Sequence, residues 1–206
     1  MTDESRSRYR TGDLDTLAEL WQCWHDAGLR MPADTWTTPS GLGDWTVREL
    51  YAHVARGVGT LADLLAQPAL PEEPALSDAA GYFAALRSFD AAQVAATARE
   101  WAAARTDDDL VDAFNTTVLA KLPRTTETVV VRGIAGTIRL ADYVVTRILE
   151  ATVHLLDLGH VVPHASAPPP AALRRTVDVL ADLSPPADFI RLATGRPSVP
   201  VFPVLT

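Results

Sequence analysis

Apolar residues recur at intervals of three and four along most of the chain, which is the spacing of one helix face. The first such stripe predicts a helix over about residues 14–28 that stops at Gly28. A second helix is predicted after Thr46, because Thr46 and Glu49 have the spacing of a capping box. Its apolar stripe consists of Leu50, Val54, Val58, Leu61 and Leu65. His53 lies at the edge of that stripe.

The middle of the chain alternates helical segments with connections of another composition. The proline-rich residues 67–77 separate the second helix from a long third helix, predicted over about residues 78–104. β-Branched residues on both sides of a glycine-containing turn predict a short hairpin, over about 127–132 and 136–139. A fourth helix is expected directly after the hairpin, over about residues 140–159.

One more helix is predicted over about residues 171–183, followed by a proline-rich tail with one short helical turn that we expect to lie across the surface. Four long amphipathic helices predict an all-α fold, a four-helix bundle with the hairpin before its fourth helix and with a C-terminal helix plus extended tail. We expect one metal-binding helical domain over residues 1–206. In it, about 14–160 form the bundle and about 161–206 form the C-terminal helix and tail.

The composition and net charge exclude several classes of function. The 206 residues are 48% hydrophobic and 21% charged, as is usual for a globular protein. The net charge of −8 argues against a nucleic-acid partner, which needs a basic patch to neutralise phosphates. No apolar run approaches the roughly 20 residues of a membrane-spanning helix, and the N-terminus is too polar for a signal peptide. We therefore expect a cytoplasmic protein with neither nucleic acid nor membrane as a partner.

Cys23 is the only cysteine of the sequence, so an internal disulfide and a four-cysteine zinc site are both excluded. Any metal ion must therefore be bound by histidine, aspartate or glutamate. Cys23 lies among the tryptophans of the first helix with no adjacent histidine or basic residue to lower its pKa, which favours packing over a nucleophilic role. The sequence contains no phosphate-binding or dinucleotide-binding fingerprint.

The fourth predicted helix carries the most informative polar residues. Glu150 and His154 are four residues apart, which places them one turn apart on one helix face, with Cβ atoms about 6 Å apart. His53 of the second helix is the best candidate for a third ligand. Two imidazoles and one carboxylate suit zinc, nickel, iron and similar divalent ions, and three protein ligands leave a position for water or substrate. The pattern indicates a catalytic metal site.

Other roles are open for these residues and their neighbours. A glutamate and a histidine at this spacing often form only a surface hydrogen bond. Arg147, three residues before Glu150, could pair with that carboxylate or recognise a substrate carboxylate. Asp157, three residues after His154, could fix the imidazole tautomer by accepting a hydrogen bond, or could be solvated. The helix is apolar on nearly every side, so an unpaired carboxylate in it would be costly, which favours the metal site.

The segments that carry these residues resemble a known family. GLGDWTVRELYAHVARGV, RILEATVHLLDLGH and DFIRLATGR are similar to segments of the mycothiol-dependent maleylpyruvate isomerase N-terminal domain family, which belongs to the DinB-like metal-binding four-helix bundles. The resemblance spans nearly the whole chain. It implies that the histidine of W-T-V-R-x-L-x-x-H, His53, binds one divalent ion, generally zinc. The other implied ligands are Glu150 and His154 of R-x-x-E-x-x-x-H-x-x-D.

The resemblance also implies a chemistry. Characterised relatives use mycothiol, a low-molecular-weight thiol, as cosubstrate, and a metal ion can bind a thiol as the thiolate. The thiolate then adds to an activated double bond, or displaces a leaving group. The implied function is a metal-dependent enzyme, a thiol S-transferase or a maleylpyruvate-isomerase-like enzyme, whose partners are a small thiol and an electrophilic substrate. The lack of a catalytic cysteine fits a thiol supplied from outside.

The isomerase itself has a further C-terminal domain that helps to form its active site. Here residues 161–206 follow the fourth helix, so an S-transferase or another metalloprotein of this fold is favoured over the isomerase reaction itself. Two alternatives stay open: a non-catalytic bundle that binds a metal or ligand, and a structural domain in which Glu150 pairs with Arg147. Relatives of this fold often form dimers through their helices, so a homodimer is also compatible with the resemblance.

Overall fold

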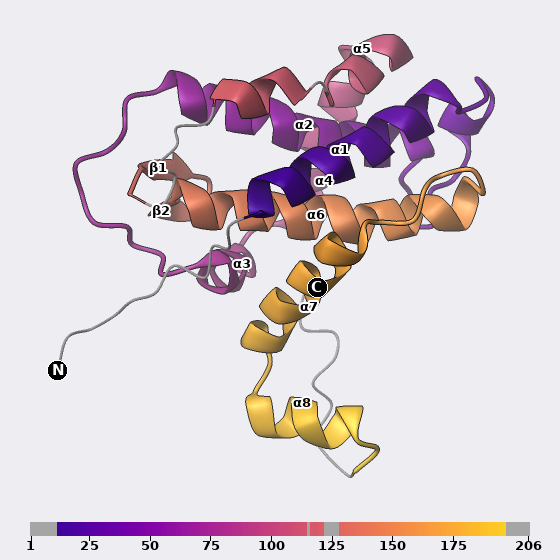
Figure 1. Cartoon of the computed structure of the whole chain (residues 1–206). Helices are drawn as coiled ribbons and strands as arrows, with labels where there is room; N and C mark the ends of the chain where they lie inside the picture. The colour runs from indigo at the N-terminus through magenta and orange to yellow at the C-terminus, as the bar shows by residue number, and fades with distance from the viewer. Residues whose placement is uncertain (1–11, 115, 122–127, 197–206) are drawn as a thin grey trace, which may run out of the picture.

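Four helices packed side by side form the body of the protein (Figure 1). The structure is a computed structural model, and it describes residues 12–114, 116–121 and 128–196. The four helices are α1 (Asp13–Leu29), α2 (Val47–Ala66), α4 (Ala91–Ala103) and α6 (Leu140–Val161). Helix α6 contacts α1 and α2, and α2 packs on α4. The all-α bundle predicted from the apolar stripes is therefore confirmed.

Helix α2 begins at the capping box that the sequence predicts. The Glu49 carboxylate accepts a hydrogen bond from the Thr46 backbone N–H at 2.7 Å, and the Thr46 hydroxyl accepts one from the Glu49 N–H at 3.3 Å. These two bonds satisfy backbone groups that the first turn of a helix leaves free. The stripe that follows buries Leu50, Val58 and Leu61 in the core. This start sets the helical phase that places His53 at the edge of the buried face.

Helix α6 forms the centre of the core but is not buried on every side. Its buried residues include Tyr143, Val144 and Ile148, whereas Leu156 is 44% exposed. The apolar character of its sequence therefore overstates its burial, because one side of α6 faces a cavity and solvent. No helix among the described residues, α6 included, is both long and apolar enough to span a membrane.

The predicted third helix is wrong as a single element. Residues 79–103 form two helices, α3 (Ala79–Leu86) and α4, with a break between them. The Ser88 hydroxyl donates to the Ala85 carbonyl oxygen at 3.0 Å, and the Asp90 carboxylate accepts from the Ala92 N–H at 2.9 Å. Both side chains thus satisfy backbone groups at helix ends, which competes with a continuous helix. Phe89 is left 41% exposed at the break.

The predicted hairpin is present directly before α6. Strands β1 (Val130–Gly133) and β2 (Gly136–Arg139) pair antiparallel with Val131 opposite Ile138. The start of the predicted first strand, at residue 127, lies outside the described residues. Three short elements were not predicted, because a turn or two of helix shows little apolar periodicity. They are the 3-10 helices η1 (Thr35–Thr37) and η2 (Thr116–Lys121), and α5 (Asp107–Asp112).

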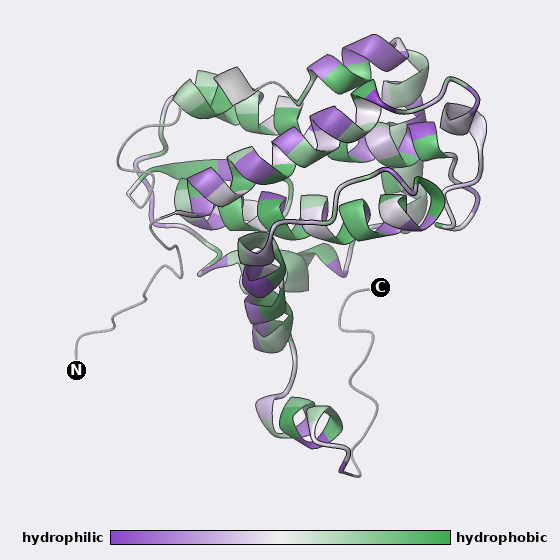
Figure 2. Ribbon diagram, turned by 45° about the vertical axis from the view of Figure 1, so that its right-hand side comes forward, coloured by the Kyte–Doolittle hydropathy of each residue, from purple (hydrophilic) through white to green (hydrophobic). Residues whose placement is uncertain are grey.

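The C-terminal helices extend away from the bundle. Helix α7 (Pro170–Leu183) packs on α6 and α3, while α8 (Pro186–Ala193) contains no buried residue. Both views show α8 apart from the bundle (Figures 1 and 2). Figure 2 shows hydrophobic and hydrophilic positions mixed along this helix. The described part of the tail therefore does not lie across the surface as expected. Residues 197–206 of the predicted tail lie outside the described residues.

At Gly28, α1 packs directly against the Tyr51 side chain of α2 and against Val111 of α5. A Cβ atom at this position would lie 2.5 Å from both the Tyr51 hydroxyl oxygen and Val111 Cγ2. Tyr51 is fully buried and its hydroxyl donates to the Trp24 carbonyl oxygen at 2.8 Å, so it has little freedom to move. We expect Gly28→Ala to lower the free energy of unfolding by about 1–3 kcal/mol through overpacking, as measured by urea denaturation.

Gly159→Ala in α6 is the matched control for this prediction. Nothing lies within 4 Å of a Cβ atom at Gly159. Because alanine favours the helix over glycine, this variant is expected to keep its stability or to gain up to about 1 kcal/mol. Equal stability of the two variants would contradict the close approach at Gly28.

Candidate metal centre

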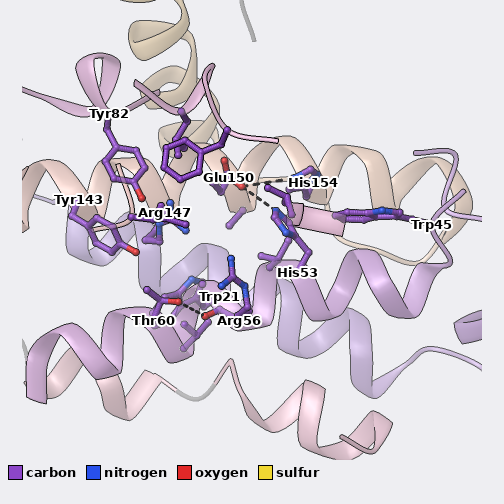
Figure 3. A pocket seen from close by; sticks show the side chains of 18 residues that line it. Trp21, Trp45, His53, Arg56, Thr60, Tyr82, Tyr143, Arg147, Glu150 and His154 are labelled. Carbon is purple, nitrogen blue, oxygen red and sulfur yellow. Dashed lines mark hydrogen bonds and ion pairs between the residues drawn. The ribbon is translucent and has the colours of Figure 1, made fainter. Parts of the chain in front are cut away.

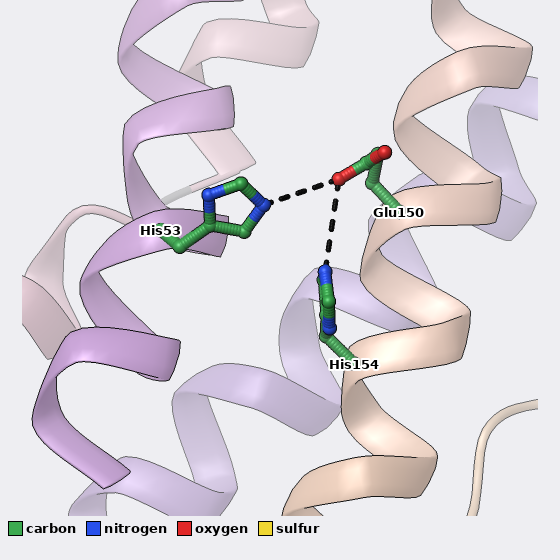
Figure 4. A group of neighbouring side chains, drawn as sticks. All are labelled: His53, Glu150 and His154. Atoms are coloured by element: carbon green, nitrogen blue, oxygen red, sulfur yellow. Dashed lines mark hydrogen bonds and ion pairs between the residues drawn. The ribbon is translucent and has the colours of Figure 1, made fainter. Parts of the chain in front are cut away.

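His53, Glu150 and His154 converge from two helices. His53 projects from α2, and Glu150 and His154 project from successive turns of α6 toward it (Figure 4). The Glu150 Oε2 atom is 3.3 Å from His53 Nε2 and 3.8 Å from His154 Nε2. One ligand atom from each residue lies within 4.8 Å of the other two. Among the described residues, no other three His, Cys, Asp or Glu side chains meet in this way.

Aromatic contacts hold the His53 ring in place. The Trp45 ring lies 5.2 Å from it, between centroids, and the His154 ring lies 5.1 Å from it at nearly a right angle. Trp45 comes directly before the capping residue Thr46, so the same local structure that starts α2 also places the indole beside His53. The imidazole therefore meets Glu150 in a fixed orientation.

The electrostatics of the cluster favour the protonation states that a metal ion needs. Burial lowers the pKa of His53, although its hydrogen bond with Glu150 acts in the opposite direction. For Glu150, burial acts to raise the pKa, but the hydrogen bond with His53 and the charge of Arg147 outweigh it and hold the pKa at about 2. At neutral pH Glu150 is therefore an anion, and His53 is a neutral imidazole whose Nε2–H donates to that carboxylate. Metal ligands require both of these forms.

Asp157 orients His154. The His154 Nδ1 atom lies 2.9 Å from Asp157 Oδ2, and since a carboxylate can only accept, Nδ1 carries the proton and donates it. The Nε2 atom, which faces Glu150, then presents its lone pair. This contact is one of the two roles that the sequence left open for Asp157. The Nδ1 atom of His53 is buried and has no hydrogen-bond partner within the described ranges, so only one of the two imidazoles has such support.

We expect Asp157→Ala to weaken metal binding by about 10- to 100-fold, because the His154 ring loses its fixed tautomer and orientation. Zinc affinity measured by competition with a chromophoric chelator checks this. Asp63→Ala is the control: it removes the same charge from an exposed position of α2, and its zinc affinity should equal that of the unaltered protein. Equal affinities of the Asp157 variant and the control would argue that Asp157 is merely solvated.

The three ligand atoms fit a divalent ion such as zinc. Two imidazole nitrogens and one carboxylate oxygen are a donor set that zinc accepts, with about 2.0–2.2 Å from ion to ligand. The observed separations need only small side-chain movements to reach that geometry. Since all three residues line a cavity of about 420 Å³, a fourth position would face space large enough for a small molecule (Figure 3).

Arg147 lines the same cavity but does not pair with Glu150. Its Nε atom donates to the Thr146 hydroxyl at 3.1 Å, and its guanidinium carbon lies 4.9 Å from the centre of the Tyr143 ring. No ion pair joins it to Glu150, or to any other carboxylate within the described ranges. A purely structural Arg147–Glu150 pair, one of the alternatives left open by the sequence, therefore does not form.

Two residues that line the cavity near Arg147, Tyr82 and Tyr143, were not anticipated as site residues from the sequence. In Figure 3, Trp45 lies on one side of His53, and Tyr82, Tyr143 and Arg147 lie together on the other. Tyr143 could have been found, since it precedes Arg147 by four residues on α6. Tyr82 could not, because α3 was predicted as part of a longer helix with no relation to α6.

Cys23 does not line the cavity. It is half-buried against the core, and burial raises the pKa of its thiol, with the charges of Asp26 and Glu19 acting in the same direction. A thiol in this setting stays protonated at neutral pH and is a poor nucleophile. The packing role favoured by the sequence agrees with this position.

Comparison with models of known protein families gives a match. The model of a family described as the mycothiol maleylpyruvate isomerase N-terminal domain matches residues 17–159, well over half of the chain. The matched segment runs from α1 almost to the end of α6 and contains His53, Glu150 and His154. No curated protein and no solved structure matches the chain.

Proposed function

Because this chain belongs to the mycothiol maleylpyruvate isomerase N-terminal domain family, we propose that it is a metal-dependent enzyme with a mycothiol-like thiol as cosubstrate. The proposed reaction joins the thiol to an electrophilic small molecule, either as a stable product or as a step of an isomerisation. The observation that carries the proposal is the convergence of His53, Glu150 and His154 on a cavity of about 420 Å³.

The side chains divide the work between binding the ion and shaping the cavity. When bound, a divalent ion supplies a Lewis acid that lowers the pKa of a thiol. His154 offers an Nε2 lone pair, and His53 would offer one when its proton moves from Nε2 to Nδ1. Glu150 adds one negative charge. Asp157 and Trp45 hold the two imidazoles in place through the contacts described above.

The chain supplies no thiol of its own to the cavity. Cys23 lies outside it and has a raised pKa, which favours a nucleophile that enters as a second substrate. A free thiol with a pKa near 8.5 is only about 3% ionised at pH 7. An enzyme that ionises it fully and holds it beside the electrophile therefore gains on the order of a hundredfold or more in rate.

A conjugation assay tests this proposal. Zinc-loaded protein is incubated with mycothiol and a panel of electrophiles, including maleylpyruvate and 1-chloro-2,4-dinitrobenzene, and both thiol loss and product are measured. We expect turnover with at least one electrophile, on the order of a hundredfold above the protein-free rate. Stoichiometric zinc without turnover for any thiol would support a non-catalytic metal-binding bundle instead.

A further inference from the structure

The cavity contains a cationic group, Arg147, that forms no ion pair with any described residue; the charge of Glu150 acts on it only from beyond ion-pair distance. Arg147 is half-buried on α6, and its Nε atom is occupied by the Thr146 hydroxyl. No hydrogen bond or ion pair within the described ranges satisfies its two terminal NH₂ groups. A guanidinium in such a place is costly unless an anion pairs with it. Its NH₂ groups form a fork that matches a carboxylate with two parallel hydrogen bonds.

Two tyrosine hydroxyls accompany this guanidinium. Tyr82 and Tyr143 are 2% and 1% exposed, their rings meet edge to face at 5.8 Å, and both line the cavity. Figure 3 shows both hydroxyl groups directed toward the Arg147 side chain. Burial raises the pKa of Tyr82 to about 12, so its hydroxyl keeps its proton at neutral pH and can donate it. This end of the cavity therefore presents hydrogen-bond donors and one positive charge.

A glycine of α2 leaves room for the guanidinium. A Cβ atom at Gly57 would lie 3.3 Å from Arg147 Nη1, which is tighter than nearly all such contacts. Gly57 is one turn beyond His53, and Arg147 is one turn before Glu150. With a helical rise of 1.5 Å per residue, Arg147 lies about 7.5 Å along α6 from the midpoint of Glu150 and His154. If Arg147 binds the carboxylate of a substrate, a carbon of the same substrate that is three or four bonds from that carboxylate would lie beside the candidate metal ligands.

The remaining wall on this side is apolar. Leu86 and Phe89, at the break between α3 and α4, and Ile134 of the hairpin turn also line the cavity. Phe89 is 41% exposed and Ile134 is 66% exposed, so a ligand can contact both side chains without any change in the packing of the core. A ligand with a carboxylate and an apolar body would bury that body here.

We propose that Arg147, together with the hydroxyls of Tyr82 and Tyr143, binds the carboxylate of the electrophilic substrate. The substrate class is then a carboxylic acid with an apolar body and a reactive carbon three or four bonds from the carboxylate. This inference names the substrate class of the proposed function. It rests on that function only in assuming that the reaction takes place at the candidate metal ligands. Binding itself is independent of turnover, so the two can fail separately.

Calorimetric titration of the full chain tests the carboxylate subsite without any thiol. The probes are phenylacetate and 3-phenylpropionate, each paired with its neutral amide, and both metal-free and zinc-loaded protein are used. We expect each carboxylate to bind at least tenfold more tightly than its amide, which corresponds to about 1.4 kcal/mol. The preference should persist in the metal-free protein, because the carboxylate pairs with Arg147 and not with the ion.

The variants locate the subsite. Arg147→Met should abolish the preference for carboxylate over amide, whereas Arg56→Met, the same change at another cavity arginine, should leave most of it. Tyr82→Phe and Tyr143→Phe should each weaken carboxylate binding a few-fold and leave amide binding unchanged. If Arg147→Met proves unstable, Arg147→Lys keeps the charge but loses the fork, and should show an intermediate preference.

Three results would overturn the proposal. The first is equal affinity of carboxylate and amide for the unaltered protein. The second is a preference for carboxylate over amide that persists in a folded Arg147→Met protein. The third is a preference for carboxylate over amide that is lost when only the metal is removed. Turnover in the conjugation assay is a separate readout. A carboxylate preference without turnover refutes the proposed function alone, and turnover without the preference refutes the subsite alone.

Discussion

His53→Ala protein is expected to purify without a stoichiometric metal ion, whereas we expect the unaltered chain to purify with one ion per molecule. His53 is the contribution of α2 to a cluster otherwise built on α6, so its loss leaves two ligands on one helix. Structural zinc sites gain about 10–16 kcal/mol from four ligands, or roughly 3 kcal/mol each, so zinc affinity should fall on the order of a hundredfold. Elemental analysis after dialysis and a chelator competition titration measure this.

His160→Ala provides the matched control for this variant. His160 also belongs to α6 but is exposed, and its Nδ1 atom lies 2.8 Å from the Leu156 carbonyl oxygen of its own helix. Its loss should leave the metal content unchanged. A His53→Ala protein that still carries one ion per chain would show that the ion is bound elsewhere.

Removal of the metal should suppress thiol turnover as strongly as any mutation. After dialysis against dipicolinate, the conjugation rate is expected to fall on the order of a hundredfold, because a thiol in water is mostly protonated at neutral pH. One equivalent of zinc should restore the rate. The assay is the one described above, run before and after zinc is returned.

Cys23→Ser separates this account from one in which the chain provides the nucleophile. Cys23 is half-buried and does not line the cavity, so the serine variant should keep its turnover and its dependence on zinc. Loss of turnover in a folded Cys23→Ser protein, or full turnover of the chelated protein, would contradict a metal-activated external thiol.

Local signals predicted most of the helices. The capping box at Thr46 and Glu49 identifies the start of α2 because its hydrogen bonds involve only neighbouring residues. The break between α3 and α4 was missed because Ser88 and Asp90 sit in an apolar, alanine-rich run whose periodicity continues on both sides. Their competing side-chain hydrogen bonds outweigh the weak gain of continuing the helix.

The candidate site was predictable to the extent that it lies within one helix. The spacings of Glu150, His154 and Asp157 on α6 place all three by helical geometry alone. That His53 meets them depends on how α2 packs on α6, which no local pattern determines. The sequence offered His53 only as the best-placed imidazole of another helix, and the family resemblance implied the same residue. Tyr82 depends on α3 and on the hairpin, and no spacing in the sequence relates these elements to α6.

The central claim is that one ion is bound jointly by α2 and α6, and anomalous diffraction at the zinc edge from crystals of zinc-loaded protein tests it most directly. The account predicts one peak about 2.0–2.2 Å from His53 Nε2, His154 Nε2 and a Glu150 carboxylate oxygen. A peak bound by other side chains, or one with the His53 ring outside its coordination shell, would contradict it.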